Sequence, residues 1–242
     1  MSHERKLPTE FVELPSEGVV YPKDHPLASG KVEMKYMTAK EEDILTNVNY
    51  ITDGSVLDRV LQSLIVTKFN YDDLITGDKE ALIVAARILG YGKDYAFNYG
   101  GKSYTADLTK LKNKPFDKSL FENGTEIPFT LPNTRMNVTV KLLTHGDEKK
   151  IEAELKGLQK IHPRGSFDIT TKLKYLITSM EGERDRASIR DFVDNYLMAS
   201  DSRAVRSFVE QISPGIELKH YPEGVEEGID IRVGVDFFWP SV

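Results

Sequence analysis

The chain has 242 residues, of which 40% are hydrophobic and 29% charged, and its formal net charge is −6. These values exclude collagen-like and wholly disordered chains, and they suit one large domain or two small ones. The acidic balance argues against a nucleic-acid-binding protein, although it leaves room for a local basic patch.

The chain contains no cysteine, which removes disulfides, thiolate zinc sites and cysteine nucleophiles. No apolar run follows the charged start MSHERK, so we expect no secretory signal. The longest apolar stretch, residues 82–89, is much shorter than the roughly 20 residues of a membrane span. We therefore expect a cytosolic protein without a membrane span.

Residues 1–30 are predicted to form an extended, proline-rich arm with a turn at residues 16–18. Prolines recur at positions 8, 15, 22 and 26, and each removes a backbone donor and disfavours helix. The arm carries several apolar side chains, which would be unusual in a free tail. We expect it to be docked, either along its own domain or across a neighbour.

Residues 31–125 are predicted to form an α/β region. Residues 31–37 alternate charged and apolar side chains, as a half-buried strand does. Thr38 and Glu41 have the spacing of a capping box that opens a helix, and a second helix begins near Ser55. Residues 72–78 are predicted to form a turn that ends in a helix N-cap at Asp78.

A third, strongly apolar helix is predicted over residues 79–89, with Gly90 ending it. Two strand-like runs, residues 95–99 and 102–108, are joined by Gly100-Gly101, which is typical of a hairpin. Residues 109–126 are lysine-rich and lack periodicity, so we predict a loop there.

Residues 126–242 are predicted to form a mainly helical region that a β-hairpin closes. A first hairpin spans residues 127–131 and 134–143, and a last one spans residues 216–220 and 229–238. Between them we predict four helices, over residues 148–160, 169–180, 186–199 and 202–212. Helices and hairpins without regular βαβ units indicate an α+β fold.

No motif assigns a catalytic centre. The chain lacks the GxxxxGK[ST] phosphate loop and the GxSxG nucleophile elbow, and Gly90-Tyr91-Gly92 fits a helix end better than a dinucleotide fingerprint. His145, Asp147 and Glu148 are a candidate metal or acid–base group, but a helix start also favours carboxylates. We expect no catalytic residue, no cofactor, no metal and no small-molecule substrate.

Several short strings occur in an order that resembles the baseplate proteins of T-even-type contractile-tailed phages, a family that includes a hub subunit. LPSEGVVYP at residues 14–22 resembles the opening of that family, and a strand followed by TAKEEDIL at residues 38–45 is similar to its next elements. DLITGD, RILGYG, LLTHGDE and the final FFWP then follow at residues 73–78, 87–92, 142–148 and 237–240. The likeness covers nearly the whole chain.

One departure from that family concerns thiols. Members often carry Cys-x-x-Cys pairs after the Gly-Tyr-Gly stretch and again before the final Phe-Phe-Trp-Pro. This chain has residues 98–101 and 220–224 at those places, without cysteine. If zinc clips the hairpins of relatives, this chain has to close them with glycine turns and packing alone.

The resemblance implies a structural part of the tail baseplate, a hub-type subunit that assembles in the host cytoplasm and remains in the virion. The alternative is an assembly factor that the finished particle does not retain; an enzyme such as a peptidoglycan hydrolase is the weaker third hypothesis. Either leading function implies an oligomer or hetero-complex with other tail proteins rather than with a membrane or nucleic acid.

Three regions are candidate contact surfaces: the arm at residues 11–21, the basic loop at residues 110–121 and the C-terminal tail at residues 237–240. A solvated loop is the simpler explanation of the lysines, and for the tail core packing and partner contact are equally open, since large aromatic side chains bury roughly 150–250 Å² each in either setting. The selected residues are Phe11, Val12, Leu14, Val19, Tyr21, Lys112, Phe116, Phe121, Phe237, Phe238 and Trp239.

Overall fold

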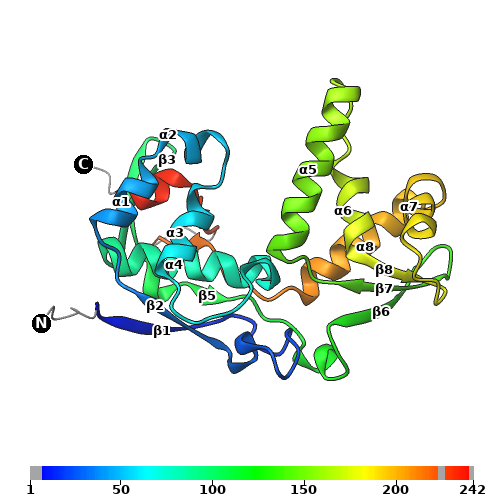
Figure 1. Cartoon of the computed structure of the whole chain (residues 1–242), viewed down its shortest axis with the longest axis horizontal. Helices are drawn as coiled ribbons and strands as arrows, with labels where there is room; N and C mark the ends of the chain where they lie inside the picture. The colour runs from blue at the N-terminus through cyan, green and yellow to red at the C-terminus, as the bar shows by residue number, and fades with distance from the viewer. Residues whose placement is uncertain (1–6, 223–226, 240–242) are drawn as a thin grey trace, which may run out of the picture.

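The computed structural model describes residues 7–222 and 227–239, and it confirms the α+β fold. Figure 1 shows two lobes side by side. The N-terminal lobe contains the first helices and hairpins together with the last strands of the chain. The C-terminal lobe contains a three-stranded sheet and four helices, of which α5 (His145–Ile161) projects away from the body of the molecule.

The arm is docked on its own domain. β1 (Thr9–Glu13) pairs antiparallel with β2 (Lys31–Lys35), which places Val12 opposite Val32. The chain between them makes tight turns and the 3-10 helix η1 (Pro26–Ser29), and the Leu14 amide donates to the Gly30 carbonyl at 2.9 Å. Leu14, Val20 and Tyr21 of the arm are therefore buried within the chain itself, whereas Phe11 and Val19 stay exposed.

Four helices follow in the N-terminal lobe: α1 (Ala39–Leu45), α2 (Val48–Thr52), α3 (Val56–Leu64) and α4 (Thr76–Tyr91). The capping box of Thr38 and Glu41 is confirmed. The predicted end of the third helix was wrong, because α4 continues through Gly90 and stops at Gly92, whose φ is 82°. Only there does the backbone enter the left-handed region that favours glycine.

The predicted hairpin is confirmed in β3 (Asp94–Tyr99) and β4 (Lys102–Asp107). Its two turn residues, Gly100 and Gly101, have φ of 57° and 76°, the positive pair that a two-residue hairpin turn requires. The predicted loop contains more structure than expected: the 3-10 helices η3 (Leu108–Lys110) and η4 (Lys118–Phe121), and the short strand β5 (Lys112–Asn113).

The C-terminal lobe is built on the sheet β6-β7-β8, made of β6 (Glu126–Thr130), β7 (Asn137–Lys141) and β8 (Ile177–Met180). A helix was predicted through residue 180, but α6 (Asp168–Leu176) stops earlier and β8 joins β7. Buried Ile177 and Ser179 alternate with half-buried neighbours, which is the period of a strand. α7 (Arg186–Asn195) and α8 (Ala199–Ile212) complete the lobe.

The last segment of the chain returns to the N-terminal lobe. β9 (Ile216–Glu217) pairs with β5, β10 (Lys219–His220) pairs with β11 (Ile229–Asp230), and η5 (Val235–Phe238) packs on α4. The predicted strand over residues 229–238 is therefore a short strand followed by a 3-10 turn. In space this segment is part of the first lobe, although it was grouped by sequence with the second.

Buried Arg87 fixes this returning segment. Its guanidinium donates to the carbonyls of Phe237 at 3.1 Å, Gly92 at 2.9 Å and Asp94 at 3.3 Å. Burial lowers the pKa of Arg87. A cation at the carbonyl end of α4 also complements the helix dipole, so one side chain joins α4, β3 and η5.

Candidate interaction groove

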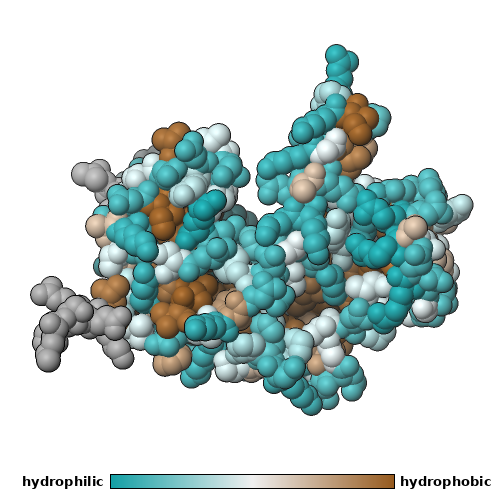
Figure 2. Space-filling view, viewed as in Figure 1, coloured by the Kyte–Doolittle hydropathy of each residue, from teal (hydrophilic) through white to brown (hydrophobic). Residues whose placement is uncertain are grey.

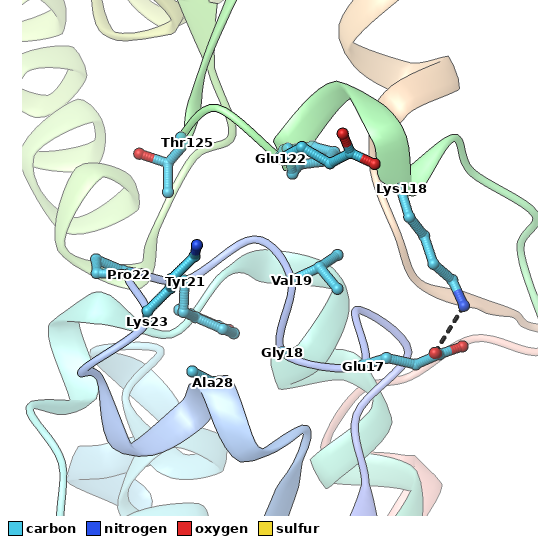
Figure 3. Close-up of a pocket in the computed structure, with 12 residues that line it drawn as sticks. Glu17, Gly18, Val19, Tyr21, Pro22, Lys23, Ala28, Lys118, Glu122 and Thr125 are labelled. Atoms are coloured by element: carbon cyan, nitrogen blue, oxygen red, sulfur yellow. Dashed lines mark ion pairs between the residues drawn. The ribbon is translucent and has the colours of Figure 1, made fainter.

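Two of the predicted contact regions meet in space. The arm at residues 17–23 and the connection from η4 to β6 at residues 118–125 lie on opposite sides of a pocket of about 630 Å³, as Figure 3 shows. Its lining combines apolar side chains, including Val19 and buried Phe121, with charged residues. Glu17 of the arm and Lys118 of η4 form an ion pair of 2.6 Å across it.

The bend of the arm depends on Gly18. Its φ is 82°, and a Cβ at this position would lie 2.5 Å from the carbonyl oxygen of Ala28. A larger residue would therefore meet both backbone strain and a clash with backbone that cannot easily move. The Gly18 amide donates to the Ser16 hydroxyl at 3.1 Å, which tightens the turn predicted there.

A buried carboxylate holds this turn against α4. Asp78 accepts from the Ser16 hydroxyl at 2.6 Å, from the Ser16 amide at 3.0 Å and from the Tyr21 hydroxyl at 2.7 Å. The Tyr21 hydroxyl in turn accepts from the Ile75 amide at 3.2 Å. Burial raises the pKa of Asp78, and burial together with the nearby carboxylate raises that of Tyr21 far above its usual range. The phenol thus stays protonated and able to donate.

A second cavity of about 350 Å³ adjoins the first, since Tyr21, Pro22, Phe121 and Thr125 line both. His25 stacks on Tyr21 with ring centroids 5.5 Å apart and lies 3.3 Å from an Asp73 oxygen. The second cavity reaches the strand-to-helix connection between β7 and α5. The two together form a groove along the junction of the lobes, which we call the arm groove.

The selected contact residues differ in accessibility. Phe11 (69%), Val19 (36%) and Trp239 (38%) are exposed, as is Lys112; Val12 and Phe116 are partly buried. The other five are buried, so they need correction as exposed contact residues, although Tyr21 and Phe121 line the two cavities of the arm groove. They are Leu14, Tyr21, Phe121, Phe237 and Phe238. Pro240 lies outside the described residues.

His145 belongs to a polar cluster at the lobe junction. Its Nδ1 lies 3.8 Å from carboxylate oxygens of Asp58 and Glu148, and Lys79 pairs with Glu148 at 2.6 Å. Burial opposes the ionisation of Glu148, but the nearby His145 and hydrogen bonds from Lys79 and Thr76 outweigh it and lower the pKa to about 2. Asp58 and Lys79 come from α3 and α4 of the N-terminal lobe, and His145 and Glu148 come from α5 of the C-terminal lobe, so the cluster connects the two lobes.

Asp147, the third member of that predicted group, has a different place. It closes a capping box with Thr144 and pairs with Lys141 at 2.6 Å, so its role is the helix start that the sequence also suggested. Within residues 7–222 and 227–239, no three His, Asp or Glu side chains are arranged to hold a metal ion, and every helix is too short or too polar to traverse a bilayer.

No family model, curated protein or solved structure matches this chain.

Aromatic packing joins the β3–β4 hairpin to the paired strands β10 and β11. The ring of His220, on β10, meets Phe97 and Tyr104 of the β3–β4 hairpin edge-on, with centroids 5.8 and 6.1 Å apart. Tyr95 stacks on Phe97 and also contacts Phe237. The two places where cysteine pairs were expected in relatives thus belong to hairpins that pack against each other. Part of the second, residues 223–224, lies outside the described residues.

Proposed function

We propose that this chain is a structural subunit, of hub type, in the baseplate of a contractile phage tail, where it acts through protein–protein interfaces. The likeness of its ordered strings to the T-even-type family supports this proposal. So does the arm groove, because it offers a recessed apolar surface beside charged groups. Such a surface suits an apolar anchor side chain of a partner protein.

The arm groove is stronger support for a binding site than a single exposed residue, because several residues line it. Val19 stands at its edge with 36% of its surface exposed, above a turn that Gly18 and the buried Asp78 hold in place. A preformed pocket loses little conformational entropy on binding, which favours affinity. The ion pair of Glu17 with Lys118 adds charges that a partner can match.

The test is co-purification with the other tail proteins of a phage that encodes this chain. Val19→Glu places a carboxylate in the groove and should abolish capture of the partner, whereas Val48→Glu, at a 72% exposed position on α2, should leave capture intact. Equal thermal melting of both variants shows that folding is unchanged. If the Val19→Glu variant still co-purifies with the partner protein, the groove is not the contact site.

Mass spectrometry of purified particles tests the role itself. A structural subunit persists in the virion at a fixed copy number. An assembly factor is present in infected cells and absent from particles, and that result would replace the proposal by the alternative function. Binding through the arm groove is compatible with both results, so the two experiments fail independently.

A further inference from the structure

β1 has an outer edge whose backbone groups are unpaired among the described residues. The Leu14 amide donates to the Gly30 carbonyl, and the Tyr36 amide donates to the Pro8 carbonyl. With the register of the β1–β2 ladder, these two bonds show that residues 8, 10, 12 and 14 point their backbone groups toward β2. In an antiparallel ladder such hydrogen-bonded pairs alternate with pairs whose N–H and C=O groups point away from the partner. The outward-pointing residues are Thr9, Phe11 and Glu13.

This edge is also exposed. β1 lies at the border of the N-terminal lobe in Figure 1, and four of its five residues are exposed, with Phe11 at 69%. A proline often protects a strand edge because it has no N–H to donate. At Pro8, however, the missing N–H would point toward the β2 side of the ladder, so the proline does not block the outer edge. On the face drawn in Figure 2, a hydrophobic patch lies beside the position of β1, towards α4.

The geometry points to a second copy of this chain as the occupant of that edge, paired antiparallel about a two-fold axis at Phe11. In this register the three outward residues of each copy meet as hydrogen-bonded pairs: Phe11 with Phe11, and Thr9 with Glu13 in both directions. Two bonds for each of three pairs give about six hydrogen bonds. The result is a continuous four-stranded sheet, β2-β1-β1-β2.

The sequence of β1 is self-complementary in this register. Each Glu13 faces a threonine and each Glu10 faces Val12, so no like charges are directly opposite, which is the arrangement that stabilises cross-strand pairs. The two Phe11 rings, otherwise exposed, cover each other at the axis. An isologous contact of this kind closes on itself and stops at a dimer. It is separate from the arm groove and does not depend on the proposed function.

The absence of native cysteine makes the register directly testable on the full chain. Phe11→Cys puts two thiols across a hydrogen-bonded pair whose Cα atoms are about 5.5 Å apart, within disulfide range. Mild oxidation should therefore give a covalent dimer. Thr9→Cys is the matched control, because its thiols would lie about 13 Å apart along the strands and should not cross-link.

Sedimentation of the unmodified chain from about 1 µM to about 1 mM should show a monomer shifting to a dimer. Phe11→Lys, which sets two charges face to face, should lose the dimer; Phe11→Tyr should keep it, as should Tyr196→Lys at another exposed aromatic position. A monomer at every concentration, assembly beyond a dimer, or equal cross-linking of the two cysteine variants would overturn the inference. So would a dimer that survives Phe11→Lys.

Discussion

Tyr21→Phe removes one oxygen atom from the network that holds the arm against α4. The hydroxyl donates to the buried carboxylate of Asp78 at 2.7 Å and accepts from the Ile75 amide at 3.2 Å. A hydrogen bond to a charged group contributes about 1.5–3 kcal/mol, and a buried amide left unpaired costs about 1 kcal/mol or more. Because phenylalanine keeps the ring, no large cavity forms. The free energy of unfolding should fall by about 3 kcal/mol.

Urea denaturation measures this loss. With a slope of about 3 kcal/mol per molar, the midpoint should drop by about 1 M without a change of slope. Tyr221→Phe is the matched control, since its hydroxyl donates to Glu217 on the surface at 2.5 Å and should cost well under 1 kcal/mol. If both variants unfold at the same urea concentration, the Asp78 network does not hold the arm, and the reasoning fails.

Three further outcomes are expected. Burial opposes the ionisation of Glu41, but hydrogen bonds from Ser63 and its other partners lower its pKa to about 2. The ionised carboxylate therefore stabilises the fold by about 3 kcal/mol above pH 4.5, and this stabilisation is lost as the pH falls towards 2. Glu41→Gln should flatten the acid-unfolding curve between these two pH values. Arg87→Met should cost about 3 kcal/mol and speed hydrogen exchange in residues 229–239, because three carbonyls lose their donor. Gly18→Ala should destabilise by several kcal/mol in thermal melts, but Gly54→Ala by only about 1 kcal/mol, since both have positive φ and only Gly18 faces a clash.

Each of these outcomes has a contrary result. An acid-unfolding curve that Glu41→Gln leaves unchanged would place the pH dependence elsewhere, for example on Glu148. Unaltered exchange at the C-terminus of the Arg87 variant would mean that packing alone retains that segment. Equal costs for the two glycine substitutions would show that the Ala28 backbone shifts freely to admit a Cβ.

Local features were predictable because neighbouring residues encode them. Thr38 with Glu41 predicted a capping box, and Gly100-Gly101 predicted a hairpin, from a few adjacent positions. β8 was missed because residues 177–180 continue a helical pattern and become a strand only where β7 offers backbone partners. Tertiary context of this kind overrides local propensity.

The candidate sites show the same division. The arm and the basic loop were each predicted as contact surfaces. No pattern in the sequence indicated that they share a groove, since the ion pair of Glu17 with Lys118 joins segments that are far apart in the chain. Asp78 was predicted as a helix cap, whereas its carboxylate binds Ser16 and Tyr21. The role of Arg87 was not predictable, because its three partners are backbone carbonyls that carry no side-chain signature.

The return of the C-terminal segment has a consequence for synthesis. Phe237 and Phe238 are fully buried in the N-terminal lobe, although they follow the whole C-terminal lobe in the sequence. The C-terminal lobe can therefore fold while the chain is still being made, but α4 must wait for its final cover. The synthesis of residues 229–239, rather than the emergence of its own helices, sets the moment at which the N-terminal lobe is completed.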